Sequence, residues 1–500
     1  MGEMSLQQRG QTAQALAGQG RFAEALALVR GANDRERPAL LDLEVGLLRV
    51  CQDFDDLVAL RRRQVVERPA SAVAHHNLGS ALGDAGKQAE AEACARKALS
   101  LGGNSPETWL VLARALQGVA KLEESVAAYR EVLARKPDYV EAISELAQQI
   151  WMMGGEVEAA REPFETALIS FPSSSPLLRA LAVFNAYVGM SAKAVHADLL
   201  ERTHRVGLRD AAVEVAASHL ALDFDVDLAM SHAAMAVELA ASDLSAWTAV
   251  AKCHLVKGEA EQALAIMDKL VVAAGQDQAT LAIHATAARM AGRANPTGLD
   301  DAEGLIRAST IDTPEGWSSL SDYLADLTQA LEAQHSFSRH PIGQSLRHGS
   351  QTPVDLRHVD DPVIQAFFKA IDGPIRDYLA ALGQGSDAVR RRNTGDYRIV
   401  GCWSVRLHSG GFHEAHIHSR GWLSSACYID LPQAVDRGGT EGWIAFGVPP
   451  YTLPAPLEPL KVEKPEPGKL VLFPSCMWHG TLPFDDERHR LTIAFDLIPV

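Results

Sequence analysis

A short segment of the chain, "HEAHIHSRG", gathers three histidines, His413, His416 and His418, within six positions. If the segment is extended, residues i and i+2 point to the same face, so His416 and His418 lie side by side. Two imidazoles on one face can bind a single metal ion, and imidazole suits a borderline ion such as Fe(II). The sequence therefore predicts a metal site around these two residues.

A distal histidine and an arginine follow this pair. His479 stands in "FPSCMWHG", at the end of another apolar stretch, and Arg490 opens the last apolar stretch soon after it. An H-x-H pair, a distal histidine and a following arginine form a recognisable spacing. Non-haem Fe(II) oxygenases use a facial triad of protein ligands and leave the other positions open for oxygen and a co-substrate. We therefore expect His416, His418 and His479 to share one ion.

The last 200 residues supply the strands that must position these side chains. From residue 397 onward short alternating stretches dominate, among them "YRIVGCWSVRLH", "WLSSACYIDLP", "KLVLFPS" and "RLTIAFDLIP", each bounded by Gly, Pro or Asp. This pattern is typical of an antiparallel sandwich or barrel, whose mouth can hold one ligand. Residues 315–333 and 361–382 have the periodicity of amphipathic helices.

The first 300 residues follow a different pattern, a repeat of about 34 residues. Leu78, Leu112 and Leu146 recur at this constant step, and each precedes a small residue. Trp109 and Trp247 stand four such steps apart. Such a period indicates stacked helical hairpins, in which small residues let two helices approach closely. Glycines near the middle of each repeat suit the turn between its helices, namely Gly86, Gly154 and Gly258.

Composition changes between these two regions. Only 8 of the 24 prolines and 3 of the 8 tryptophans lie before residue 300. The segment "AGRANPTG" near residue 295 predicts a turn-rich connector. We therefore divide the chain into a helical solenoid at 1–292, a connector at 293–334 and a β domain at 335–500.

Bulk composition narrows the classes of function. A net charge of −16, with 22 % charged and 47 % hydrophobic residues, is ordinary for a soluble protein and argues against nucleic-acid binding. The six cysteines contain no CxxC pair, which fits reduced thiols in a cytoplasm. No apolar run reaches the ~18–20 residues of a membrane helix, and the start "MGEMSLQQRG" does not have the pattern of a signal peptide. We expect a cytoplasmic protein without nucleic-acid or membrane partners.

Both regions resemble known families. The helical region resembles tetratricopeptide repeats, best over residues 73–106, 107–141, 142–175 and 245–275. The region from about 335 to the C-terminus resembles the bacterial 2-oxoglutarate/Fe(II)-dependent oxygenases that are fused to such repeats. The stretches that carry this resemblance are "HPIGQSLRHGSQT", "HIHSRGWLSSACYIDLP" and "PGKLVLFPSCMWHGTLPFDDERHRLTIAFD". More distantly, the arrangement is similar to the prolyl-hydroxylase type of double-stranded β-helix. The resemblances imply a multidomain α plus β chain, with an all-α repeat solenoid followed by a double-stranded β-helix, or jelly roll, with flanking helices.

The oxygenase resemblance also implies roles for single residues. His416 would be the first iron ligand and His479 the distal one, while His418 stands where the wider superfamily has an aspartate. Arg490 would pair with the distal carboxylate of 2-oxoglutarate, with Thr492 beside it on the same strand face. No catalytic side chain beyond the metal centre is implied.

The co-substrate anchor has further candidates. Tyr428, which follows His416 on the next apolar stretch, resembles the tyrosine that hydrogen-bonds the same carboxylate in prolyl hydroxylases. Arg488 shares the strand face of Arg490 and is the alternative anchor. Arg490 could instead form a surface ion pair with one of the three acidic residues just before it.

The third metal ligand stays open at this point. Three neutral imidazoles leave an iron ion more positive than two histidines and a carboxylate would. His418 is the favoured third ligand, Glu414 is the alternative on the same strand face, and the site could also bind metal poorly. We interpret His413 and His408 as rim or surface residues.

Three functions follow from these observations. The favoured one is an Fe(II)/2-oxoglutarate-dependent dioxygenase that uses dioxygen to hydroxylate a peptide or protein recruited by the repeat groove. The first alternative is a protein-interaction scaffold with a catalytically silent jelly roll. The second is an oxygenase of a small metabolite whose repeats form a homo-oligomer.

Overall fold

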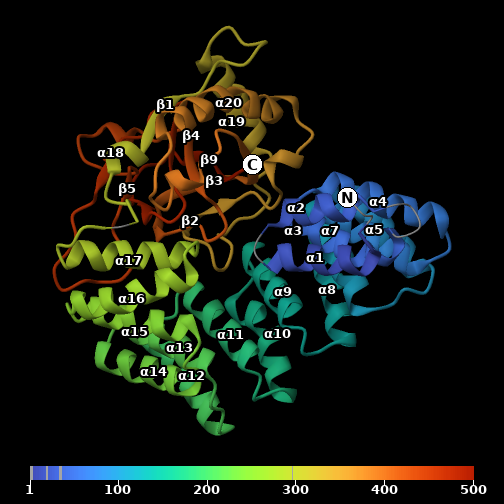
Figure 1. Cartoon of the computed structure of the whole chain (residues 1–500), viewed down its shortest axis with the longest axis horizontal. Coiled ribbons are helices and arrows are strands. Elements are labelled where there is room, and N and C mark those ends of the chain that lie inside the picture. Colours follow the sequence, from blue (N-terminus) through green and yellow to red (C-terminus); the bar gives the residue numbers. More distant parts are fainter. Residues whose placement is uncertain (1–3, 19–20, 33–36, 296) are drawn as a thin grey trace. The chain divides into compact units, whose positions relative to one another are not determined.

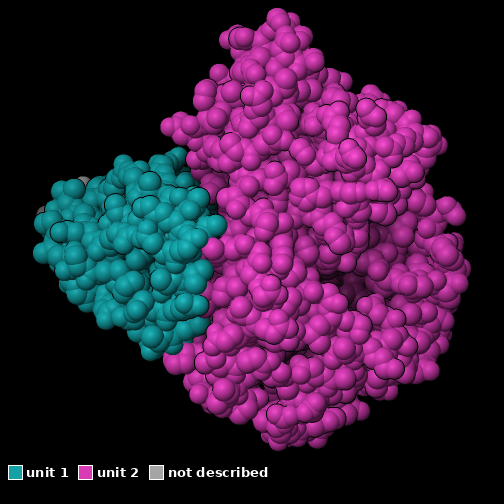
Figure 2. Space-filling model, turned by 180° about the vertical axis from the view of Figure 1, so that it is seen from behind, with its two compact units in different colours: residues 1–136 teal, residues 137–500 magenta. Residues whose placement is uncertain are grey.

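The computed structural model describes residues 4–18, 21–32, 37–295 and 297–500. It divides into two compact units, Met1–Lys136 and Pro137–Val500, which Figure 2 colours separately. The division falls within the repeats, so the domain limits at 292 and 335 stay a prediction. Pro296, near the start of the expected connector, lies outside the described residues.

Unit 1 consists of antiparallel helices that contact their neighbours along the chain (Figure 1). Its helices are α1 (Leu6–Gly18), α2 (Phe22–Arg30), α3 (Leu41–Val50), α4 (Phe54–Glu67), α5 (Ala72–Asp84), α6 (Gln88–Ser100), α7 (Pro106–Gly118) and α8 (Leu122–Arg135). The start of α7 shows why they begin where they do. Ser105 accepts a hydrogen bond from the N–H of Thr108, and Pro106 occupies the first turn, where no N–H is needed.

Unit 2 begins with the remaining repeat helices. They are α9 (Val140–Met152), α10 (Val157–Ser170), α11 (Ser175–Tyr187), α12 (Ala192–Arg205), α13 (Ala211–Ala221), α14 (Val226–Leu239), α15 (Leu244–Val256), α16 (Ala260–Ala274) and α17 (Gln278–Met290). From α9 to α17 each odd-numbered helix contacts the next odd-numbered one. These helices therefore form one continuous layer of the solenoid, which we call the inner layer.

Glycines end the first helix of several repeats, as expected. Gly86, Gly154 and Gly258 follow α5, α9 and α15 with φ angles of 72°, 87° and 79°. Side chains rarely adopt these angles, so glycine allows the chain to turn at once into the next helix. Repeats that match the sequence pattern only loosely, such as α11–α14, have the same hairpin form.

The C-terminal part of unit 2 is built on an antiparallel sheet. Its strands are β1 (Arg307–Thr310), β2 (Leu346–Gln351), β3 (Tyr397–His416), β4 (Leu423–Asp430), β5 (Ile444–Phe446), β6 (Lys461–Glu463), β7 (Lys469–Pro474), β8 (His479–Thr481) and β9 (Arg490–Pro499). The strand order is β1-β7-β4-β9-β3-β8-β5-β6, and β2 also pairs with β3.

The long strand β3 curls this sheet. Its first part pairs with β9, as far as Leu407 opposite Arg490, and its last part pairs with β8. Gly410 lies between these parts with a φ of 74°. At Gly411 a Cβ atom would lie 2.6 Å from the carbonyl oxygen of His408, so only glycine fits this close approach. The predicted fold class, a repeat solenoid followed by a jelly roll, is confirmed.

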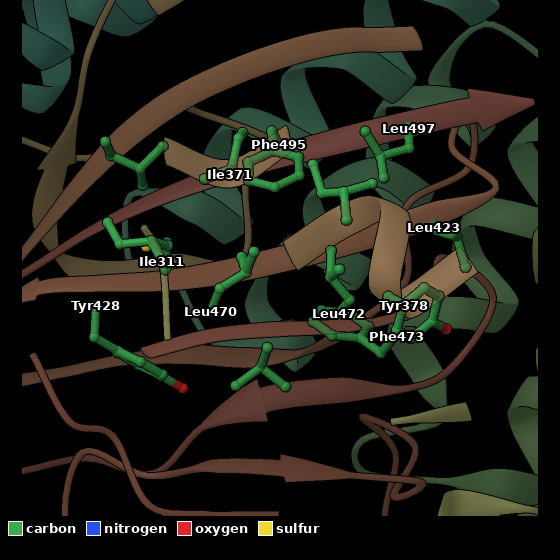
Figure 3. Close-up of a cluster of buried hydrophobic side chains, with 14 of the residues drawn as sticks. Ile311, Ile371, Tyr378, Leu423, Tyr428, Leu470, Leu472, Phe473, Phe495 and Leu497 are labelled. Atoms are coloured by element: carbon green, nitrogen blue, oxygen red, sulfur yellow. The ribbon is translucent and has the colours of Figure 1, made fainter. Parts of the chain in front are cut away.

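Helices cover one side of the curled sheet (Figure 1). They are α18 (Ala302–Leu305), α19 (Leu320–Glu332) and α20 (Pro362–Leu382), so both predicted amphipathic helices are present. Their apolar faces pack on β1, β4 and β7. Figure 3 shows the resulting core, in which Ile371 and Tyr378 of α20 lie among Leu470, Leu472 and Phe495 of the strands.

Among the contacts that join the inner layer to the β domain within unit 2, two involve tryptophan side chains. At the first, Trp151 of α9 donates a hydrogen bond to the carbonyl of His340 at 3.0 Å, and the Arg339 guanidinium lies 4.3 Å from the centre of the Trp151 ring. At the second, Trp478 donates to Thr286 of α17 at 3.0 Å. The segment 338–345, which leads from the first contact site into β2, is called the strap below.

Within the described residues no helix is long and apolar enough to cross a membrane.

Candidate metal centre

The structure brings the three predicted histidines together. His416, at the end of β3, pairs directly with His479, at the start of β8. His418 follows in a loop that is fixed where its N–H donates to the carbonyl of Ser475 at 2.9 Å. One ring nitrogen from each of the three imidazoles lies within 4.8 Å of the others, so these residues could hold one metal ion.

The hydrogen bonds of the three rings decide which nitrogen faces the shared point. Nδ1 of His416 lies 2.8 Å from the carbonyl oxygen of Glu414, and Nδ1 of His479 lies 2.9 Å from that of Met477. A carbonyl oxygen only accepts, so Nδ1 carries the proton in both rings and Nε2 offers a lone pair. Nδ1 of His418 lies 2.5 Å from a carboxylate oxygen of Asp496, which has the same effect.

The lone pairs then meet. Nε2 of His416 and Nε2 of His418 are 3.2 Å apart. Two such nitrogens repel each other unless a proton or a metal ion lies between them. The donor set therefore fits a metal ion, and imidazole nitrogen suits ions such as Fe(II) and Zn(II).

Burial keeps the rings of His416 and His479 neutral. Burial, and secondarily His418, lower the pKa of His416 to about 3. Burial and the neighbouring imidazoles also hold the pKa of His479 well below its usual value. A neutral imidazole is the form that binds metal, so at neutral pH these ligands need not lose a proton first.

Asp496 on β9 places a negative charge behind His418. Its carboxylate accepts from the Ser424 hydroxyl at 2.7 Å, and that hydroxyl lies 2.8 Å from the Ser475 hydroxyl. A carboxylate behind a metal-binding histidine makes the imidazole a stronger donor. Asp496 thus supplies, through the ring of His418, some of the negative charge that a triad of three histidines does not have.

Arg490 is fully buried beside this centre. Its side chain is 2 % exposed, and its Nε donates to the carbonyl of Gly442 at 3.1 Å. Within the described residues no carboxylate forms an ion pair with it, so the surface ion pair that the sequence also allowed is not seen. Burial lowers the pKa of the guanidinium. A buried cation without a counter-ion is costly, and an anionic ligand would remove that cost.

Tyr428 and Thr492 lie next to Arg490. Thr492 pairs with Tyr428 across β4 and β9, and the guanidinium lies 4.9 Å from the centre of the Tyr428 ring. The Tyr428 hydroxyl is buried, makes no hydrogen bond of normal geometry in the described part of the chain, and has its pKa raised by burial to about 12. Figure 3 shows Tyr428 at one end of the apolar core. A carboxylate placed here could accept from both Arg490 and Tyr428.

The two alternative residues are engaged elsewhere. Glu414 pairs with Arg347 at 2.9 Å, and its side chain is 48 % exposed. Arg488 pairs with Asp430 at 2.7 Å, and its side chain is 55 % exposed. His418 and Arg490 are less exposed than these two alternatives.

The structure adds site residues that the sequence did not indicate. The hydroxyl of Ser345, at the end of the strap, lies 2.9 Å from Nδ1 of His413 and 3.2 Å from Nε2 of His416. His413 therefore lines the site, and the interpretation of it as a rim or surface residue is wrong, because the bend after Gly410 turns it inward. Asp496 could have been recognised as a candidate site residue in the sequence, because it is an acidic residue inside the apolar stretch "LTIAFDLIP".

Two connected spaces surround the centre. An inner cavity of about 60 Å³ is lined by the three histidines, His413, Arg490 and Thr492, among others. An outer cleft of about 700 Å³ shares Ser345, Trp403, His416 and His418 with it and also includes Trp478 and Pro450. Tyr187, the last residue of the inner-layer helix α11, forms part of its wall. Figure 2 shows that the surface of unit 2 is hollowed.

Comparisons with known proteins agree with this arrangement. Residues 401–496 match the family described as "Putative 2OG-Fe(II) oxygenase", and residues 72–101 match the tetratricopeptide repeat family. Both resemblances seen in the sequence are thus confirmed. No curated protein was found to match the chain.

Similar solved structures match part of the chain. "MamA 41-end from Desulfovibrio magneticus RS-1" is 17 % identical, with 35 % of this chain and 99 % of that chain covered and a TM-score of 0.30. The "APC/C hetero-tetramer Cut9-Hcn1" is 18 % identical, with 55 % and 54 % covered and a TM-score of 0.29.

Proposed function

We propose that the chain is an Fe(II)/2-oxoglutarate-dependent dioxygenase that hydroxylates a peptide or protein side chain. One observation carries the proposal. Three histidines each place one ring nitrogen where a single metal ion could be shared, and a buried arginine that pairs with no carboxylate of the described residues lines the same cavity. The match of residues 401–496 to an oxygenase family supports it. With both groups bound, oxidative decarboxylation of 2-oxoglutarate to succinate and CO2 is coupled to hydroxylation of a C–H bond by dioxygen.

In this proposal His416, His418 and His479 hold the iron. Each ring is oriented by an acceptor at Nδ1, so Nε2 is aligned before the ion arrives. Three protein ligands leave positions for the co-substrate and oxygen. The buried surroundings limit access of water to the centre.

Arg490, Tyr428 and Thr492 would bind the distal carboxylate of 2-oxoglutarate. The guanidinium and the phenol hydroxyl are both hydrogen-bond donors. The described residues accept only some of the hydrogen bonds that these two groups can donate. A carboxylate satisfies both and neutralises the buried charge. The co-substrate would then be fixed at one end by these residues and at the other by the iron.

The repeats would recruit the substrate. The outer cleft is much larger than the inner cavity, and one of its walls comes from α11 of the repeats. A segment of a peptide could therefore reach the metal while its flanking residues lie on the inner layer. All six cysteines are unpaired, so we place this activity in the cytoplasm.

An anaerobic titration tests the proposal. Fe(II) and 2-oxoglutarate are added to the purified protein, and the weak visible metal-to-ligand absorption band is followed. We expect a band in the wild type, no band in His479→Ala, and a band that needs far more 2-oxoglutarate in Arg490→Ala.

Matched controls are available elsewhere in the β domain. The sequence pattern predicts Arg488 on the strand of Arg490, but Arg488 lies in the loop before β9. His408→Ala and Arg488→Ala remove a histidine and an arginine whose side chains lie at more exposed positions, and both should keep the wild-type band. Absence of the band in the wild type, together with no 2-oxoglutarate-dependent succinate in air, would favour the scaffold instead.

A further inference from the structure

A row of equivalent positions runs along the inner layer of unit 2. Val183 on α11, Lys252 on α15 and Thr286 on α17 each stand six residues before the glycine that ends the turn of their repeat. His219 on α13 completes the row, because its Nε2 lies 3.4 Å from Nζ of Lys252. We call these four residues the inner row.

The inner row faces away from the helix-packing core. Val183 is 47 % exposed, although the residues around it are apolar helix contacts. His219 is exposed and Lys252 is partly exposed, whereas Ala251 and Cys253 on either side of the lysine are buried. Thr286 differs because the β domain covers it.

The β domain occupies the last position of the row. Trp478 donates to the Thr286 hydroxyl at 3.0 Å, and the Trp478 ring packs in one apolar cluster with Ala251 and Leu255 of α15. Trp478 also lines the outer cleft that leads to the metal centre. Lys252 therefore lies one repeat away from the wall of that cleft, on the same face of the layer.

Lys252 differs in its partners from the paired cations of the same repeats. Arg202 pairs with Glu165 and Asp198, and Lys257 pairs with Asp227. Within the described residues Lys252 forms no ion pair with a carboxylate. Its surroundings exclude enough water to lower its pKa to about 8. A partly desolvated ammonium group one repeat from the cleft, without a carboxylate partner among the described residues, marks a place for an anion.

We propose that the substrate is an extended peptide whose carboxylate, about three to five residues from the side chain that is oxidised, pairs with Lys252 beside His219. This inference rests on the proposed function and adds the chemical class of the substrate. Packed helices lie about 10 Å apart, and an extended peptide spans about 3.3 Å per residue. The peptide must cross one repeat and then reach the metal centre through the cleft. These two distances together correspond to about three to five extended residues. The carboxylate is an aspartate or glutamate side chain or the C-terminus of the peptide.

The test is a random-sequence peptide library incubated with the full-length protein, Fe(II), 2-oxoglutarate and air. Peptides that gain one oxygen atom are sequenced by mass spectrometry. We expect acidic residues to be enriched about three to five positions from the oxidised residue. The library is run with free and with amidated C-termini. Enrichment that survives amidation assigns the carboxylate to side chains, and loss of oxidised peptides on amidation assigns it to the C-terminus.

Variants locate the recognition. Lys252→Gln keeps a polar side chain but removes the charge, so kcat/KM for a selected peptide should fall about tenfold or more. Lys252→Glu should replace the acidic preference with a preference for lysine and arginine at the same spacing. Lys257→Glu is the matched control at the end of the same helix, and it should keep the wild-type preference. The visible band with Fe(II) and 2-oxoglutarate shows that each variant retains its folded metal centre.

Two results would overturn the inference while leaving the proposed chemistry in place. One is a set of oxidised peptides without acidic enrichment, or with the same enrichment in Lys252→Glu. The other is a wild-type protein that shows the band and forms succinate but oxidises no peptide in the library. A wild-type protein that shows neither the visible absorption band nor succinate formation would instead contradict the proposed function itself.

Discussion

In the repeats of unit 2, interacting residues lie about one repeat apart, whereas in the β domain they come from distant segments. His219 and Lys252 are separated by 33 residues and meet because their helices are neighbours. Ser345 and His416 are separated by 71 residues, and His418 and Asp496 by 78. A substitution in the repeats should therefore act locally, whereas one in the β domain should be felt across the whole site.

Among these predictions, we expect the largest effect from a substitution at Arg490 of the β domain. Arg490→Met removes the only guanidinium proposed to bind the co-substrate, so the Kd of 2-oxoglutarate should rise about 100-fold or more, as for other buried charge pairs. The same change removes a buried cation without a counter-ion, so the melting temperature should stay the same or rise. Isothermal titration and thermal unfolding, with Arg488→Met as the control, measure both. An unchanged Kd would show that the co-substrate binds elsewhere.

Asp496→Asn tests whether distant segments share one centre. The amide keeps the shape of the side chain but removes the negative charge behind His418. Metal affinity should fall about 10- to 100-fold, as for other partners of metal-binding histidines. Competition with a chelator for Co(II) or Fe(II) measures it. A variant with wild-type affinity would mean that Asp496 has only a packing role.

Trp151→Ala tests whether a substitution in the repeats affects residues outside its own repeat when it lies where the repeats contact the strap. Trp151 is 9 % exposed and holds His340 and Arg339, five or six residues before Ser345 of the site. Loss of this ring should increase hydrogen exchange along residues 338–351 and raise the Kd of 2-oxoglutarate several-fold. Trp247→Ala, in another repeat, should change exchange only near its own helix. Equal effects of the two substitutions would show that the contact between Trp151 and the strap does not transmit changes to the site.

The smallest effect is on stability against pH. His335 lies between the hydroxyls of Ser350 and Ser404, and burial, with Arg406 nearby, lowers its pKa to about 3. As the pH falls below about 6.5, the unfolded chain takes up a proton that the folded protein does not. The free energy of unfolding should therefore fall by up to about 1.4 kcal/mol per pH unit.

Thermal unfolding between neutral and acidic pH checks this, with His335→Asn as the comparison. The variant should lose less stability than the wild type as the pH falls. Parallel curves for the two proteins would show that His335 is not the group responsible.

The sequence predicted the repeats well because their contacts are local. A constant repeat length and turn glycines such as Gly258 are enough to specify stacked hairpins. It also indicated His416, His418, His479 and Arg490, because these residue types stand at informative positions in the sequence.

Other parts of the site could not be predicted in this way. Ser345, an ordinary serine before β2, reaches the centre because the strap packs on the repeats and because its carbonyl accepts a hydrogen bond from the N–H of Glu414 on β3 at 2.9 Å. Tyr187 belongs to a repeat helix and enters the cleft only through the packing of the β domain on that layer. His413 turns inward because β3 continues through a bend at Gly410, where the sequence pattern indicated a break between strands. Each depends on tertiary packing that no local pattern contains.

The most direct measurement is a structure of the protein crystallised anaerobically with Fe(II) and 2-oxoglutarate. The account predicts one ion bound by Nε2 of His416, His418 and His479, with the distal carboxylate of 2-oxoglutarate on Arg490 and the Tyr428 hydroxyl. An ion held by other residues, or a co-substrate bound away from Arg490, would contradict it.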